Sequence, residues 1–380
     1  MSNKTQAKGR LVLWVGALAI VASFTSCEMR EEPFCPPVSD RVLLAYFGGE
    51  NNLSGETYQK IEALRAGLSP DKADCKVLIY HDPSNGAPVL SEMKTKNGQV
   101  ISDTVAAYKE ENSASANVFA RVIKEIKETY PARAYSLLLF SHGSGWLPQG
   151  ALSNPELRSV VMDGTAEMEI ADFARAIPDK TFDCIVFEAC LMAGIEVAYE
   201  LKDKTEYIFA SCAEIVSPGF TEIYPDALHL LLEGNLTAFA AQVFDYFDRQ
   251  TGEMRSATFS LVKTDGLSSL ATFIAENCDP DLPVDSRAVQ QFDRNNTYRL
   301  FFDFEDYYSR LLDSSMQRTE LRRLIGNCVI WKEATPSFLL YSNGFYINRH
   351  SGLTTYIPQQ NFPALNSRYE ETEWRKALQR

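Results

Sequence analysis

Two residues suited to nucleophilic catalysis each follow an apolar segment of this sequence. His142 lies in a glycine-rich segment directly after the apolar run 134–140, and Cys190 comes shortly after the run 183–187. A thiolate attacks carbonyl carbon, and an imidazole can accept and return the thiol proton. Taken alone, each residue has a structural explanation, as a turn histidine or a buried small hydrophobe. Their paired placement after two strands favours covalent cysteine chemistry.

The elements around these residues predict an α/β fold. Apolar runs alternate with helical patterns, which indicates a mainly parallel sheet with helices on both faces. In such sheets the working loops lie beyond the carboxyl ends of the strands. We expect a helix to begin directly after Cys190, where its N-terminus would favour a thiolate. The strands are predicted at 42–47, 76–80, 134–140, 183–187 and 207–211, a hairpin at 89–93 and 100–106, and helices from Ser54, at 117–130 and at 170–177.

The pattern beyond residue 225 is mostly helical. It predicts helices at 227–232, 236–250, 267–276, 302–312 and 319–333, and short strands at 257–262 and 354–357 that join the sheet edge. We therefore interpret 41–224 as a catalytic core and 225–380 as a helical C-terminal extension that completes it.

The N-terminal segment predicts export and a lipid anchor. Lys4, Lys8 and Arg10 precede the uncharged stretch 11–24, which is long enough for a signal peptide and too short to span a bilayer. Small residues then lead into Cys27, as at a bacterial lipoprotein cleavage site. We predict a signal peptide at 1–26, lipid attachment at Cys27, a tether at 27–40 and a location on the cell envelope, periplasmic or at the surface.

Composition narrows the class of partner. The net charge of −13 argues against nucleic acid and suits basic peptides. The eight cysteines show no C-x-x-C spacing, which argues against a zinc ribbon or a thioredoxin-type redox motif, and we expect mostly buried thiols. His81 is interpreted as a turn residue and His229 as a packed one, and His350 lacks a paired metal ligand. The acidic run 303–306 lacks EF-hand spacing. We predict no metal site and no cofactor.

Two segments carry a family resemblance. Phe140-Ser-His-Gly-Ser-Gly-Trp146 and Phe187-Glu-Ala-Cys-Leu-Met-Ala193 resemble the clostripain-like cysteine peptidases, which are grouped with caspases, legumains and gingipains. The likeness extends over roughly 41–358. It implies a caspase-like α/β/α sandwich, with His142 as acid and base and Cys190 as nucleophile. It also implies an oxyanion hole formed by the backbone N–H groups of Gly143 and Cys190.

Specificity is a further expectation from the resemblance. Family members commonly carry Asp two residues before the nucleophile, in a pocket for Arg or Lys, and this chain has Glu188 there. The alternative is that Glu188 caps the next helix. Glu214 is either a second pocket acid or a solvated loop residue, and Ser211 is a candidate contact for substrate backbone. We therefore expect an endopeptidase that cleaves after basic residues. The alternative is a non-enzymatic surface lipoprotein that binds proteins or glycans.

Some relatives cut themselves between the catalytic residues, and others are stimulated by calcium. The segment 148–163 is polar at its start and contains a single basic residue, Arg158. An exposed loop of this kind is a preferred cleavage site, so we predict self-cleavage between Arg158 and Ser159. An ordinary surface loop is the alternative. Calcium stimulation is implied by the resemblance alone.

Overall fold

The computed structural model describes most of the chain after the predicted tether. The described ranges are 38–49, 51–69, 74–149, 160–279, 282–295 and 298–379. The unit that contains them runs from Pro36 to Arg380. Within these ranges no helix is both long and apolar enough to cross a membrane.

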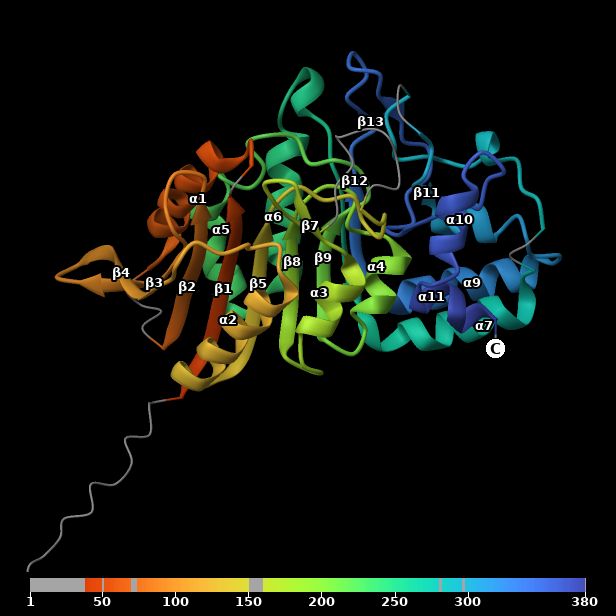
Figure 1. Ribbon diagram of the computed structural model, residues 1–380. Helices are drawn as coiled ribbons and strands as arrows, with labels where there is room; N and C mark the ends of the chain where they lie inside the picture. Colours follow the sequence, from red (N-terminus) through yellow and green to blue (C-terminus); the bar gives the residue numbers. More distant parts are fainter. Residues whose placement is uncertain are drawn as a thin grey trace, which may run out of the picture. The chain divides into compact units, whose positions relative to one another are not determined.

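A nine-stranded sheet forms the centre of the described residues (Figure 1). Its order is β12-β10-β9-β8-β5-β1-β2-β3-β4, and the five inner strands β9, β8, β5, β1 and β2 run parallel. Both edges are antiparallel. The mainly parallel α/β fold is thus confirmed. The strands are β1 (Ser39–Gly49), β2 (Cys75–Pro83), β3 (Val89–Lys96), β4 (Gln99–Ala107), β5 (Ala132–Phe140), β8 (Phe182–Glu188), β9 (Thr205–Ser211), β10 (Thr258–Lys263) and β12 (Val329–Ala334).

The inner strands are apolar on both sides because helices cover both faces of the sheet. Along β1, Leu44 and Tyr46 belong to one buried cluster, while Leu43, Ala45 and Phe47 belong to the other. Side chains alternate across a strand, so a strand buried on both faces reads as a continuous apolar run. This is why the central strands could be located from the sequence.

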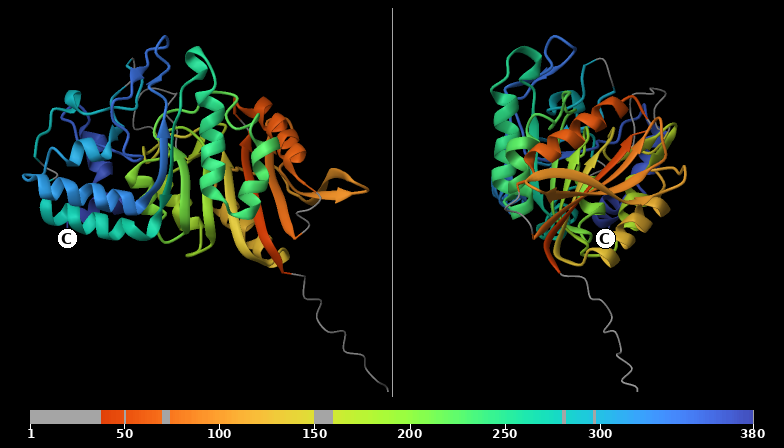
Figure 2. Two further views of the ribbon diagram at one scale, coloured as in Figure 1. Left: turned by 180° about the vertical axis from the view of Figure 1, so that it is seen from behind. Right: turned by 90° about the vertical axis from the view of Figure 1, so that its left-hand side faces the viewer.

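Each face of the sheet has its own helices. Figure 1 presents the face covered by α2 (Ala116–Thr129) and α3 (Ile170–Ala176), with α4 (Ile195–Glu200) further along. Figure 2, seen from behind, shows the opposite face. There, buried residues of three helices join the cluster that contains Leu43, Ala45 and Phe47. The helices are α1 (Ser54–Gly67), α5 (Tyr224–Glu233) and α6 (Leu236–Asp248).

The chain beyond residue 250 adds residues to the buried cluster that contains Leu44 and Tyr46, and it forms small sheets. Its helices are α7 (Leu267–Asn277), α8 (Phe304–Tyr308), α9 (Ser315–Cys328), α10 (Pro363–Tyr369) and α11 (Glu373–Leu378), with 3-10 turns η2 (Gly252–Met254), η3 (Thr264–Gly266) and η4 (Ser286–Ala288). Three two-stranded sheets pair β6 (Val161–Asp163) with β7 (Ala166–Met168), β11 (Phe302–Asp303) with β15 (Thr354–Thr355), and β13 (Ser337–Phe338) with β14 (Phe345–Tyr346).

Several predicted boundaries in the second half were wrong. The helix expected at 319–333 ends at Cys328, because the following residues form β12 against β10. The strand expected at 354–357 pairs with β11 and not with the main sheet. The helix expected at 302–312 is reduced to α8.

The topology brings four loops to one edge of the sheet. Because β1, β5, β8 and β9 are parallel, the loops after all four strands leave the sheet along its carboxyl edge. In register, Phe47 pairs with Phe140 and Phe140 pairs with Glu188. The loops that carry His142 and Cys190 therefore start next to each other.

Candidate active site

The His142 loop is held at its start and crosses the Cys190 loop. Ser141 Oγ accepts a hydrogen bond from the N–H of Met162 at 3.0 Å. Gly145 has a φ of +62°, and a Cβ there would lie 2.8 Å from the carbonyl oxygen of Leu191. Only glycine fits that conformation and that approach. The glycines beside His142 therefore allow close backbone packing around the imidazole.

Asn52 is the partner of the imidazole. Its Oδ1 lies 2.6 Å from Nε2 of His142, in the loop between β1 and α1. Asn51 fixes this loop, because its amide donates to the carbonyls of Gly48 and Met162 at 3.1 and 3.0 Å. A neutral amide thus occupies the orienting position. Sequence reasoning missed Asn52, although an asparagine placed just beyond a strand with a glycine pair at its end is a usable signal.

Cys190 lies in a tight turn after β8. Leu191 has a left-handed φ of +62°, and its N–H donates to the carbonyl of Ala213 at 2.9 Å. Helix α4 begins only at Ile195. The prediction of a helix directly after Cys190 was therefore wrong, and so was the argument that a helix N-terminus activates the thiol. The apolar residues after Cys190 pack as a turn against the loop that follows β9.

The His142 and Cys190 loops are in direct backbone contact. A Cβ added to Gly143 would lie 2.6 Å from the carbonyl oxygen of Cys190 and 3.2 Å from its nitrogen. A side chain at this position would separate the two loops. The structure thus brings together the two residues that the sequence singled out for catalysis, together with Gly143.

The surroundings of Cys190 favour the neutral thiol. Burial raises its pKa to about 12, and the charge of Glu214 contributes in the same direction. The N–H of Ile215, which donates to Sγ at 3.3 Å, and the charge of Arg294 act against this rise. The resting thiol therefore needs a base to become a nucleophile.

Glu188, the last residue of β8, is enclosed by partners from its own chain. Its Oε1 is 2.5 Å from Nζ of Lys60 and accepts the N–H of Phe220 at 2.6 Å, while Oε2 accepts the hydroxyl of Tyr224. The Glu188 and Lys60 side chains are 1% and 0% exposed. Both carboxylate oxygens are occupied from within the protein, so this placement does not support the predicted substrate role.

Ser211 is likewise enclosed. It is fully buried at the end of β9, and its hydroxyl lies 3.0 Å from that of Thr258. Its carbonyl accepts the N–H of Ala193 at 3.0 Å. These contacts tie the Cys190 turn to β9 and β10, and a contact of Ser211 with substrate stays a prediction.

Glu214 is the acid that remains accessible beside the thiol. It directly precedes Ile215, and its Oε1 accepts a hydrogen bond from Nε of Arg294 at 3.0 Å. The Glu214 and Arg294 side chains keep 31% and 28% of their surface exposed. A carboxylate in this position is open to an exchangeable cation.

Some of the remaining predicted residues lie within the described ranges, and others lie outside them. Cys184 is fully buried in β8, as expected, and the six described cysteines are free thiols. His81 lies in β2 and not in a turn, with Nε2 2.8 Å from the Thr57 hydroxyl. Cys27, Arg158 and Ser159 lie outside the described residues, so lipid attachment and self-cleavage stay predictions.

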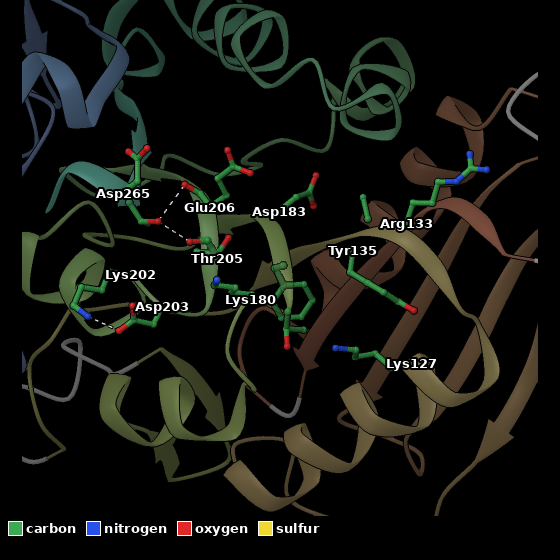
Figure 3. Close-up of a pocket in the computed structure, with 14 residues that line it drawn as sticks. Lys127, Arg133, Tyr135, Lys180, Asp183, Lys202, Asp203, Thr205, Glu206 and Asp265 are labelled. Atoms are coloured by element: carbon green, nitrogen blue, oxygen red, sulfur yellow. Dashed lines mark hydrogen bonds and ion pairs between the residues drawn. The ribbon is translucent and has the colours of Figure 1, made fainter. Parts of the chain in front are cut away.

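A separate cavity of about 540 Å³ opens at the opposite edge of the sheet (Figure 3). It lies at the amino ends of β5, β8 and β9, roughly 20 Å from Cys190 along β8 at about 3.3 Å per residue. Among its lining residues, Lys202 pairs with Asp203. Neither His142 nor Cys190 lines this cavity.

Comparison with known proteins identifies relatives of the chain. The sequence model of the clostripain family matches residues 45–356. Clostripain from Hathewaya histolytica is 26% identical over 216 residues, a match that spans 47% of this chain and 40% of clostripain. An inactive zymogen of a C11 protease from Parabacteroides distasonis is 31% identical over 91% of this chain and 99% of that one, with a TM-score of 0.78. A secreted C11 cysteine protease from Bacteroides thetaiotaomicron, solved with an irreversible peptide inhibitor, is 24% identical over 90% and 99% of the two chains, also with a TM-score of 0.78.

Proposed function

The chain belongs to the clostripain family, and from this premise we propose that it is a cysteine endopeptidase with Cys190 as nucleophile and His142 as acid and base. The observation that carries the proposal is the contact of Gly143 with the Cys190 backbone, which joins the two loops at one edge of the sheet. No carboxylate is needed as the third member, because Asn52 orients the imidazole.

The raised pKa of the Cys190 thiol favours transfer of its proton to His142 during the attack over a preformed thiolate. Because the resting thiol is neutral, His142 accepts its proton as sulfur attacks the peptide carbonyl. The C–N bond then breaks, and the amine leaves with the proton from His142. The resulting thioester is hydrolysed by water, which gives its proton to the same imidazole and releases the acid and the free thiol.

The oxyanion of each tetrahedral intermediate is assigned to the backbone N–H groups of Gly143 and Cys190. Support comes from their adjacency, since the two backbones pack directly against each other. Removing one fixed donor of this kind costs about 3 kcal/mol in the transition state. A residue larger than glycine at 143 would displace the Cys190 carbonyl and spoil the arrangement.

We assign recognition of a basic residue before the scissile bond to Glu214. It is the partly exposed carboxylate next to the sulfur, whereas Glu188 is enclosed and paired with Lys60. A guanidinium or ammonium on the substrate would exchange with the present partner of Glu214. Cleavage after Arg or Lys is the specificity that follows.

The direct test of the peptidase proposal uses purified Cys190→Ala and His142→Ala. Each should lose hydrolysis of an arginyl peptide by at least roughly 10³-fold, because the acid–base and nucleophilic steps have no substitute. Cys184→Ala is the matched control, since its thiol is buried in β8. Undiminished hydrolysis by Cys190→Ala would end the nucleophile assignment.

We further propose export and anchoring through a lipid on Cys27. The basic start, the apolar stretch and the small residues before this cysteine support the proposal. A doubly acylated cysteine binds membranes firmly. Cys27→Ser expressed in a bacterium should leave the membrane fraction and keep its peptidase, and continued sedimentation with membranes would contradict the anchor.

A further inference from the structure

Glu214 already holds a guanidinium that comes from its own chain. Nε of Arg294 donates to Oε1 of Glu214 at 3.0 Å. Guanidinium is also the group that a substrate arginine would present to this carboxylate. The two side chains are 28% and 31% exposed, so water reaches the pair. An ion pair of this exposure exchanges partners readily, because it gains little over hydration.

The pair lies beside the reacting sulfur. Glu214 is bonded to Ile215, whose N–H donates to Sγ of Cys190 at 3.3 Å. The charges of both Glu214 and Arg294 act on the Cys190 thiol, so a cation held by Glu214 lies within electrostatic reach of the nucleophile. This is where the side chain before the scissile bond must lie when sulfur attacks that bond.

The chain on either side of Arg294 is anchored to the site. The buried carboxylate of Asp293 accepts the N–H groups of Leu300 and Phe301 at 2.9 and 2.8 Å. The Phe301 ring lies against Gly145, where an added Cβ would be 2.9 Å from it. The backbone that carries Arg294 is thus fixed against the His142 loop, while the guanidinium itself stays partly open to solvent.

We propose that Arg294 is a specificity-determining residue that competes with the basic side chain of the substrate for Glu214. The inference rests on the proposed function, in which Glu214 recognises that side chain. A substrate arginine or lysine must displace Arg294, whereas a neutral residue gains nothing from doing so. Arg294 consequently weakens binding of basic substrates and narrows the preference for them over neutral ones.

The test compares two peptides that differ only in arginine or norleucine before the scissile bond. The readout is the ratio of their kcat/KM values, because a general change in Cys190 reactivity affects both peptides equally. Arg294→Gln should raise the arginine-to-norleucine ratio about three- to tenfold, mainly through a lower KM for the arginyl peptide. Arg294→Lys, which keeps a competing cation, should stay near the wild-type ratio.

A binding measurement separates competition from chemistry. Benzamidine, a small amidinium cation, is titrated calorimetrically into Cys190→Ala protein with and without Arg294→Gln. The Arg294→Gln form should bind it about three- to tenfold more tightly, and adding Glu214→Gln should remove the gain.

The outcomes distinguish failure of the Arg294 competition from failure of the Glu214 assignment. If Glu214→Gln lowers the ratio but Arg294→Gln leaves it unchanged or lowers it, Arg294 does not compete and only this inference fails. If Glu214→Gln leaves the ratio unchanged, the assignment of Glu214 fails and the competition fails with it. The nucleophile assignment is untouched by either result, because it depends on Cys190→Ala alone.

Discussion

Glu188 ends β8 and Glu214 follows the neighbouring strand β9. Each is paired with one basic side chain, yet water reaches only one of the pairs. The Glu188–Lys60 side chains are 1% and 0% exposed, whereas those of Glu214 and Arg294 are 31% and 28% exposed. Lys60 Nζ also donates to the carbonyl of Pro218 and the hydroxyl of Thr221, each at 2.9 Å. The enclosed pair therefore ties α1 to the chain after β9 beneath the Cys190 turn. The open pair can exchange its cation, so burial decides which acid is structural and which can recognise a substrate.

The largest expected effect comes from breaking the enclosed pair. Lys60→Met leaves the Glu188 charge buried without its cation, which costs roughly 3–5 kcal/mol of unfolding free energy. Arg294→Met is the matched control on the open pair and should cost only about 0.2–1 kcal/mol. Urea denaturation followed by circular dichroism measures both. Equal losses of unfolding free energy in the two variants would mean that burial does not distinguish the two ion pairs.

The second prediction concerns substrate specificity, where changing the open acid Glu214 should have a larger effect than changing the enclosed acid Glu188. Glu214→Gln should lower the arginine-to-norleucine ratio of kcat/KM by roughly 10- to 100-fold, because a hydrogen bond to a charged group is worth about 1.5–3 kcal/mol. Glu188→Gln should leave the ratio within about twofold while lowering stability. Steady-state kinetics below the melting temperature of each variant provides the comparison. If Glu188→Gln changes the arginine-to-norleucine ratio more than Glu214→Gln does, Glu188 and not Glu214 recognises the basic side chain.

A third, smaller effect is expected at Asn52, an exposed polar residue that contacts the proposed catalytic base His142, just as Arg294 contacts the proposed specificity residue Glu214. Asn52→Ala should lower kcat/KM roughly tenfold for both peptides alike, since a misoriented imidazole slows proton transfer whatever the substrate. Asn52→Asp keeps an acceptor for Nε2 and should retain more activity. An effect confined to arginyl peptides would place Asn52 in recognition and not in the orientation of His142.

The smallest effect is on the thiol itself. The Glu214 charge is among the causes that raise the pKa of Cys190, so Glu214→Gln lowers that pKa and increases the thiolate fraction at a given alkaline pH. In a His142→Ala background at pH 9, iodoacetamide should alkylate Cys190 roughly two- to fivefold faster after Glu214→Gln. Glu188→Gln should change the rate less. Slower alkylation after Glu214→Gln would contradict the sign of the Glu214 contribution.

The sequence predicted the sheet and the adjacency of the His142 and Cys190 loops because their signals are local. Strands covered on both faces are continuous apolar runs, and His142 and Cys190 follow two of them. The signal for the hairpin was equally local, since Asn97 and Gly98 adopt the left-handed conformations that its turn requires. Parallel pairing then brings the loops after β5 and β8 together without further information.

The roles of the acids could not be predicted because they depend on distant partners. Lys60 is 128 positions from Glu188, and Arg294 is 80 positions from Glu214. Nothing beside either acid shows which one is enclosed. The turn after Cys190 was missed for the same reason, since the carbonyl of Ala213 holds Leu191 in a left-handed conformation within an otherwise helical pattern.

Covalent labelling with a peptidyl-arginine chloromethyl ketone, followed by intact mass and peptide mapping, tests whether Cys190 is the nucleophile of a peptidase that prefers arginine. Sulfur displaces chloride from the probe, and the proton and chloride are released. We expect one adduct per chain on Cys190, no adduct in Cys190→Ala, and slower labelling both after Glu214→Gln and with the norleucine analogue. An adduct that persists in Cys190→Ala, or hydrolysis by a protein whose Cys190 stays unlabelled, would contradict the assignment of Cys190 as the nucleophile.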